Sequence, residues 1–362
     1  RIGGFTFGRV DVIVRKFPSR NLANSASMDE RATVLTARMF RDQIMSLTAL
    51  APPTQLDPKK FKDPSITAKG EQRASVPLGS LATLWFNTGT LCNLTCRNCY
   101  IESSPRNDRL VYLTAAEVSS YLDEIERDRL GTRLIGFTGG EPFMNPGLPA
   151  MLGDALSRGF KAMVLTNAMK PMHKMKRALL DLHRLHGHNL TIRVSIDHYG
   201  PALHEAERGA RTWQPTIDGL VWLASNGFDV HVAGRRFSAE SEEAVRRGYG
   251  RLFAGLGIAI DARDPGVLVL FPEMDSLADV PEITTACWGI LHKSPDSVMC
   301  ASARMVIKRK DAARPAVVAC TLLPYDPQFE LGETLAESST AVRLNHPHCA
   351  KFCVLGGAAC SQ

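Results

Sequence analysis

Strand-like runs alternate with helical stretches six times between residues 79 and 275, and this alternation restricts the fold more than any other feature. Strict alternation predicts parallel strands joined by right-handed crossovers. A barrel, complete or partial, and a flat doubly wound sheet both satisfy it. The expected strands are 81–87, 133–138, 161–166, 191–196, 228–233 and 266–271. The expected helices are 114–126, 147–158, 174–185, 213–225 and 239–253.

The residues on either side of this repeat are expected to form separate parts. An N-terminal extension, 1–78, should hold a strand at 9–15 and a helix at 28–50 before a linker rich in turn-forming residues. The last part, 276–362, contains the runs 304–311 and 315–319, which predict a β-hairpin. The predicted division is therefore an extension, an α/β core at 79–275 and a small cysteine-rich α+β module.

Three of the nine cysteines are spaced C-x3-C-x2-C directly after the first predicted strand: Cys92, Cys96 and Cys99. Thiolates are the ligands of iron–sulfur clusters. A [4Fe–4S] cluster held by three of them offers its fourth iron to an outside ligand. A structural zinc site, which needs a fourth Cys or His nearby, and a chance spacing are the alternatives. The concentration of cysteines fits metal binding in a reducing compartment better than a disulfide framework.

Polar residues and glycines follow the ends of the predicted strands. In barrels of parallel strands the reactive groups gather at the carboxyl ends of the strands, so we expect these residues to share one pocket. They are Cys92–Cys99, Gly139–Pro142, Thr166, Asn167, Ser195, Asp197, His198, Arg235, Glu273 and Asp275.

The cysteine triplet and the segment Thr138-Gly-Gly-Glu-Pro142 together resemble the radical S-adenosylmethionine (SAM) superfamily, whose GGEP segment the latter matches. The resemblance implies a partial (β/α)6 barrel, a [4Fe–4S] cluster and SAM bound to the open iron. It also implies reductive cleavage of SAM to a 5′-deoxyadenosyl radical, which takes hydrogen from a substrate. An external electron donor such as flavodoxin or ferredoxin would be the partner.

The same resemblance suggests which residues hold SAM. Gly139 and Gly140 lack a Cβ, so their backbone can approach a ligand closely. Arg235 could neutralise the methionine carboxylate through a paired contact, or form a surface ion pair instead. Many members carry an aromatic residue before the third cysteine, whereas here Asn98 stands there and Tyr100 follows. The expected SAM-binding residues are Tyr100, Gly139, Gly140, Glu141, Pro142, Asn167, Ser195 and Arg235; Asn167 and Ser195 could alternatively cap helices.

The runs 194–199 and 204–209 are similar to the "SLDG … H … RG" signature of radical SAM enzymes that carry a SPASM or twitch module. His198 stands where those enzymes often have glycine, which suggests a different substrate pocket. We expect Asp197, His198, Tyr199 and Asp275 to contact substrate or pass a proton or electron. Local hydrogen bonding at strand ends is the alternative for each of them.

Six cysteines lie beyond the core: Cys287, Cys300, Cys320, Cys349, Cys353 and Cys360. The predicted hairpin with Cys300 and Cys320 at its ends resembles the SPASM/twitch hairpin, and the run 331–335 resembles the "LGN" stretch of that family. The full SPASM pattern has one cysteine more. Four ligands suffice for an auxiliary [4Fe–4S] cluster, and we expect Cys300, Cys320 and two of the last three to supply them. Structural zinc is the alternative.

The resemblance implies an enzyme that abstracts hydrogen from a peptide side chain or a small metabolite. One alternative is an RNA-modifying radical SAM enzyme, because residues 1–80 carry thirteen Lys or Arg against seven Asp or Glu. These basic residues are scattered and lack interleaved aromatics, which favours a solvated arm over a nucleic-acid surface. The other alternative is a non-catalytic iron–sulfur electron carrier or sensor. No membrane span or secretory signal is recognisable, so we expect a cytoplasmic protein.

Overall fold

The computed structural model describes residues 55–237, 240–272 and 277–357. The expected strand at 9–15 and helix at 28–50 lie outside these ranges. Glu273, Asp275 and Cys360 lie outside them as well.

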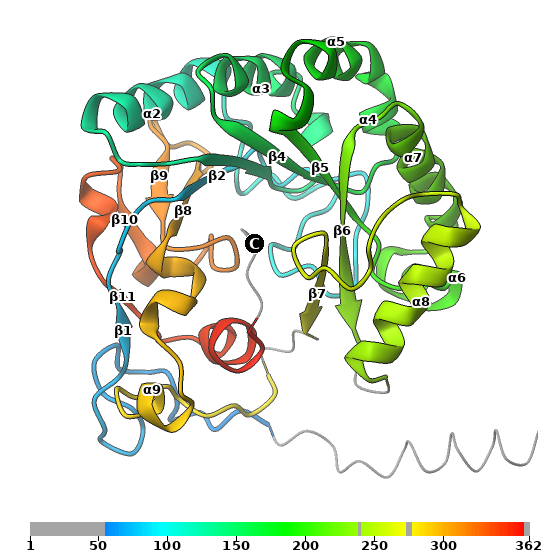
Figure 1. Ribbon diagram of the computed structural model, residues 1–362. Helices are drawn as coiled ribbons and strands as arrows, with labels where there is room; N and C mark the ends of the chain where they lie inside the picture. The colour runs from blue at the N-terminus through cyan, green and yellow to red at the C-terminus, as the bar shows by residue number, and fades with distance from the viewer. Residues whose placement is uncertain (1–54, 238–239, 273–276, 358–362) are drawn as a thin grey trace, which may run out of the picture. The chain divides into compact units, whose positions relative to one another are not determined.

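A nine-stranded sheet, in the order β10-β9-β8-β2-β3-β4-β5-β6-β7, forms the centre of the described residues (Figure 1). Its core strands are β2 (Thr83–Asn87), β3 (Leu134–Thr138), β4 (Lys161–Thr166), β5 (Leu190–Ser195), β6 (Asp229–Arg236) and β7 (Leu268–Pro272). Each of the six pairs in parallel with the next along the chain. A doubly wound sheet would reverse its strand order partway across, and no such reversal occurs between β2 and β7. The partial (β/α)6 barrel is therefore confirmed.

Helices follow the core strands and cover the outer face of the curved sheet (Figure 1). They are α2 (Ala115–Asp128), α3 (Leu148–Ser157), α4 (Lys170–Lys174), α5 (Lys176–His186), α6 (Pro201–Arg208), α7 (Trp213–Ser225) and α8 (Glu242–Gly255). Helix α2 begins with a reciprocal capping box between Thr114 and Glu117 and ends at Arg129 in a left-handed conformation (φ 53°). Helix α6 has no counterpart among the expected helices.

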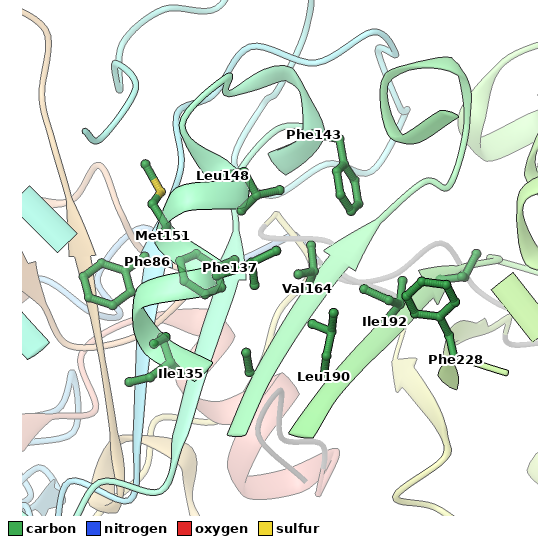
Figure 2. Close-up of a cluster of buried hydrophobic side chains, with 14 of the residues drawn as sticks. Phe86, Ile135, Phe137, Phe143, Leu148, Met151, Val164, Leu190, Ile192 and Phe228 are labelled. Carbon is green, nitrogen blue, oxygen red and sulfur yellow. The ribbon is translucent and has the colours of Figure 1, made fainter. Parts of the chain in front are cut away.

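The hydrophobic core lies between the outer face of the sheet and these helices. Side chains alternate between the two faces along each strand, so Phe137, Val164 and Ile192 point to the same side from three neighbouring strands (Figure 2). Leu148 and Met151 of α3 pack against them. All five side chains are buried, and each contributes about 1.5–3 kcal/mol through removal from water.

The inner face of the barrel is filled by the alternate residues of the same strands. Trp85 of β2 is fully buried there and pairs in register with Gly136 of β3. A Cβ on Gly136 would lie 2.2 Å from the indole ring. The sequence therefore needs glycine at position 136 to admit the tryptophan, which closes the barrel beneath the strand ends.

The C-terminal module continues the sheet of the core. Strand β8 (Ala303–Ile307) pairs in parallel with β2 and antiparallel with β9 (Ala316–Val318), which in turn pairs with β10 (Glu330–Gly332). The expected hairpin is thus present. Strand β1 (Ser75–Val76) pairs separately with β11 (Val342–Arg343). The remaining helical segments are α9 (Cys287–Ile290), the π-helical segment η7 (Cys349–Leu355) and the 3-10 turns η1 (Pro142–Met144), η2 (Gly187–Asn189), η3 (Pro295–Ser297), η4 (Met299–Ala301), η5 (Pro327–Phe329) and η6 (Glu337–Ser339).

Among the helices of the described ranges, none combines the length and the apolar character that crossing a bilayer requires.

Candidate functional site

A cavity of about 130 Å³ lies where the carboxyl ends of the core strands meet. Because the strands are parallel, the residues that follow them come to the same rim of the barrel. The predicted site residues that line this cavity are Cys92, Cys96, Cys99, Tyr100, Gly139, Gly140, Asn167, Ser195, Asp197 and Arg235. The structure therefore brings together residues that lie more than a hundred positions apart in the sequence.

The three thiols of the first cysteine group all face this cavity. Cys92 Sγ accepts a hydrogen bond from the Leu94 amide and Cys99 Sγ accepts one from the Ser103 amide, each at 3.4 Å. Burial, with a smaller contribution from the Glu141 carboxylate, raises the pKa of the Cys92 thiol to about 12. Amide donors to sulfur stabilise the thiolate form that a cluster requires. The buried thiol must release its proton when a metal binds.

Cys92, Cys96 and Cys99 line the same cavity. A cube of four irons has four ligand positions, and three thiolates fill three of them. In the described ranges no three His, Cys, Asp or Glu side chains already stand in the arrangement that a single bound metal ion would need. The three thiols therefore match the ligand number of a cluster with one open iron.

The two glycines of the GGEP segment pack against the backbone that leads into the cysteine loop. A Cβ on Gly139 would lie 2.5 Å from the Gly89 carbonyl oxygen, and one on Gly140 would lie 2.2 Å from that of Leu91. The Gly140 amide donates to Gly89 O at 2.8 Å. Both glycines also line the cavity. Their lack of a side chain thus serves first to hold β3 against the cysteine loop.

Glu141 and Pro142 of the same segment point away from the cavity. The fully buried Glu141 carboxylate accepts hydrogen bonds from Thr166 Oγ1 at 2.8 Å, the Asn167 amide at 2.9 Å and the Phe143 amide at 3.2 Å. Burial outweighs these bonds and raises the pKa of Glu141 to about 7. Glu141 therefore fastens the end of β3 to the end of β4, while Pro142 begins η1.

The side chain of Asn167 is already engaged by the protein. Its Nδ2 donates to Asn93 Oδ1 at 2.9 Å, and its Oδ1 accepts from the Met169 amide at 3.1 Å, just before α4. Asn167 does not cap α4, whose N-cap residue is Met169 with no side-chain cap hydrogen bond. Asn167 lines the cavity. Ser195 is half-buried and lines the same cavity.

The Asp197 carboxylate and the guanidinium groups of Arg208 and Arg235 line the same cavity. Arg208 Nε lies 2.8 Å from Asp197 Oδ2, and Arg235 Nε lies 3.7 Å from Asp197 Oδ1. Burial alone would raise the pKa of Asp197, but the two guanidinium groups hold it below its ordinary value. The Nη1 of Arg235 donates no hydrogen bond within the described residues. One positive charge therefore remains available to an anionic ligand.

Arg208 and Asn87 are among the cavity residues that were not predicted as site residues. Arg208 lies beside Asp197, and the "RG" of the signature run was the signal that could have identified it. Asn87 ends β2 and is fully buried. Its Nδ2 has no hydrogen-bond partner among the described residues. Its position at a strand end was the only sequence signal for it.

His198 and Tyr199 are placed away from the cavity that Asp197 lines. His198 Nε2 lies 2.9 Å from Glu240 Oε2, and the Tyr199 hydroxyl donates to Glu240 Oε1 at 2.6 Å. The Tyr199 ring packs on α8, where a Cβ on Gly248 would lie 2.3 Å from it. These contacts connect the loop after β5 with the start of α8.

A second cavity, in the C-terminal module, gathers four further thiols. Cys300, Cys320, Cys349 and Cys353 all line it, although they come from three separate segments of the chain. Burial, followed by the neighbouring thiols, raises the pKa of Cys349 well above its ordinary value. Cys287 is not among the lining residues; its Sγ lies 3.4 Å from the amide and hydroxyl of Thr284.

Comparison with known proteins agrees with this geometry. The family model described as "Radical SAM superfamily" matches residues 86–244. The antilisterial bacteriocin subtilosin biosynthesis protein AlbA of Bacillus subtilis (strain 168) is 26% identical over 170 residues, which are 47% of this chain and 35% of AlbA. The chain thus spans about a third of that curated relative.

Solved structures share the fold. Streptococcus suis SuiB bound to S-adenosylmethionine gives a TM-score of 0.51 at 12% identity over 70% of this chain and 63% of SuiB. SuiB bound to the precursor peptide SuiA gives 0.51 at 12% over 71% and 63%. Native anSMEcpe with bound AdoMet gives 0.52 at 14% over 71% and 79%. The matched domain and the cysteine loop at the rim of the barrel thus make residues 86–244 of this chain similar to the radical SAM superfamily.

Proposed function

We propose that this protein is an enzyme that reductively cleaves SAM and abstracts hydrogen from a peptide. The observation that carries the proposal is one cavity that Cys92, Cys96 and Cys99 line together with Gly139 and Gly140. A non-catalytic electron carrier would need the thiols and would have no use for the GGEP segment packed beside them.

Different residues of the cavity would bind the cluster and the methionine carboxylate. Cys92, Cys96 and Cys99 would hold a [4Fe–4S] cluster that supplies the electron for cleavage of SAM to methionine and a 5′-deoxyadenosyl radical. Arg235, with its unpartnered Nη1, would take the methionine carboxylate, since a guanidinium binds carboxylate through paired hydrogen bonds. Asp197 would keep Arg208 neutralised, so that the cavity presents one net positive charge rather than two.

The substrate class is proposed from the named relatives. AlbA is a biosynthesis protein of a bacteriocin, and SuiB has been solved with a precursor peptide. We therefore propose a peptide, with a side chain of that peptide losing hydrogen to the 5′-deoxyadenosyl radical. An external carrier such as flavodoxin or ferredoxin would supply the electron.

The four thiols of the C-terminal cavity are proposed to hold an auxiliary [4Fe–4S] cluster. Four thiolates complete the ligand set of one cluster. Four thiolates can equally close around one zinc ion, so structural zinc is the alternative. Cys287 lies outside this set.

The catalytic proposal is tested by incubating anaerobically reconstituted, reduced protein with SAM and measuring 5′-deoxyadenosine. We expect formation by the wild-type chain and none above background by a C92A/C96A/C99A variant. Equal yields from the two proteins would overturn the proposal. Iron, sulfide and zinc analysis of the same triple variant decides the second site: about four irons per chain support a cluster, whereas one zinc supports the alternative.

A further inference from the structure

The segment Cys320–Tyr325 runs from one cysteine cavity to the other. Cys320 lines the C-terminal cavity. The next residue, Thr321, lines the cavity of Cys92, Cys96 and Cys99, called the SAM cavity below because the proposed function assigns SAM to it. Leu322 lines the C-terminal cavity and a groove of about 420 Å³ that Cys99 also borders. Thr321 and Leu322 are buried. Because Thr321 directly follows Cys320, a structural change at Cys320 can reach the cavity lined by Cys92, Cys96 and Cys99 through buried neighbouring residues.

The segment ends on the loop that carries Cys92–Cys99. The Tyr325 hydroxyl donates to the Ile101 carbonyl at 2.8 Å and accepts from Asn107 Nδ2 at 3.2 Å. The Arg109 guanidinium lies 3.5 Å from the centre of the Tyr325 ring. Hydrogen bonds and a cation–π contact thus fix one aromatic ring against the part of this loop that follows Cys99.

The carbonyl that Tyr325 holds belongs to the turn that places Cys99. The Glu102 amide donates to Cys99 O at 2.9 Å, and Glu102 adopts a left-handed conformation with φ 50°. The Ser103 amide that follows donates to Cys99 Sγ. A non-glycine residue keeps such a conformation only where its surroundings impose it. The bond from Tyr325 to Ile101 is one such constraint.

We propose that Tyr325 is a positioning residue that couples the four-cysteine site to the SAM cavity, so that filling one site tightens binding at the other. This inference rests on the proposed function. By linkage, metal in the C-terminal site must strengthen SAM binding by the factor by which SAM strengthens metal binding there. Couplings between sites in proteins are commonly about 5- to 150-fold.

The test compares two tyrosines that each reach from one part of the chain to another. Y325F removes the hydroxyl that bonds Ile101 and keeps the ring. Y121F is the matched control: the Tyr121 hydroxyl donates to Glu333 O at 2.7 Å and lies 3.4 Å from Pro315 O, both outside the cysteine loop. SAM dissociation constants are measured by anaerobic equilibrium dialysis on reconstituted full chains. The SAM-induced change in the electron paramagnetic resonance (EPR) spectrum of the cluster is recorded in parallel.

We expect Y325F to weaken SAM binding about tenfold and Y121F to leave it unchanged. We expect C320S/C353S, which disables the C-terminal site, to weaken SAM binding similarly and to show no further loss when combined with Y325F. Equal SAM affinity of Y325F and Y121F, or additive losses in the combined variant, would overturn the coupling. If C320S/C353S does not fold, the metal affinity of the C-terminal site is measured in wild type and Y325F with and without SAM. We expect SAM to strengthen metal binding in the wild type and not in Y325F, and equal effects in the two proteins would overturn the coupling. Absence of SAM binding by the wild-type chain would instead refute the proposed function.

Discussion

The most demanding prediction concerns the charged side chains of Asp197, Arg208 and Arg235, which line the cavity at the strand ends. The Asp197 carboxylate lies 2.8 Å from Arg208 and 3.7 Å from Arg235, and all three side chains are at most 12% exposed. Asp197→Asn keeps the size of the side chain and removes its charge, which leaves two buried guanidinium groups without a counter-charge. Breaking a buried ion pair from one side destabilises a protein by about 3–5 kcal/mol.

Urea unfolding of wild-type and D197N protein measures this difference directly. Because the folded pKa of Asp197 is lowered, its stabilising contribution is present above the unfolded pKa of about 3.9 and is lost only as pH falls through the folded pKa. The difference between the two proteins should therefore stay constant from about pH 8 to about pH 5. E243Q breaks the exposed pair between Glu243 and Arg247 and should change the unfolding free energy by about 0.5 kcal/mol or less.

Two results would refute this reasoning. A D197N difference of about 1 kcal/mol, in the range of an exposed pair, would show that the carboxylate does not neutralise buried charge. A difference that shrinks between about pH 8 and about pH 5 would show that the pKa of Asp197 is raised rather than lowered.

Three further predictions concern other parts of the site. G140A places a Cβ 2.2 Å from Leu91 O and should reduce the unfolding free energy by about 1–3 kcal/mol and abolish SAM binding in dialysis. G153A, whose Cβ would lie 3.7 Å from Leu182, should leave SAM binding unchanged; equal effects would contradict the packing argument. C300S should lower metal content by one whole centre, whereas C287S should not, as judged by metal analysis of both. Y199F should lower the free energy of unfolding in urea by about 1 kcal/mol and should still form 5′-deoxyadenosine. A Y199F protein that is as stable as wild type but inactive would support a catalytic role for Tyr199.

The sequence was sufficient for features that depend on periodicity and strand ends. The core strands end within a few residues of their predicted positions, and Cys92, Gly139, Ser195 and Arg235 meet at one rim because parallel strands bring their carboxyl ends together. Helix α6 was missed because its eight residues, Pro201–Arg208, were interpreted as part of a signature run. Periodicity over so short a segment carries little information.

Side-chain partners were less predictable, because they depend on contacts between distant segments. His198 and Tyr199 stand at a strand end beside Asp197, yet both bond Glu240, which lies forty-one or more positions later. Glu141 belongs to a family segment, yet its carboxylate fastens two strand ends. The grouping of Cys300, Cys320, Cys349 and Cys353 without Cys287 likewise required the path of the chain.

The central claim is that Cys92, Cys96 and Cys99 build a cluster whose open iron receives SAM. EPR spectroscopy of the dithionite-reduced protein, with and without SAM, tests it most directly. The account predicts a cluster signal that changes when SAM is added, and loss of that SAM-sensitive signal in C92A/C96A/C99A while any signal from the C-terminal site persists. A SAM-sensitive signal that survives in the triple variant, or a wild-type cluster signal indifferent to SAM, would contradict the account.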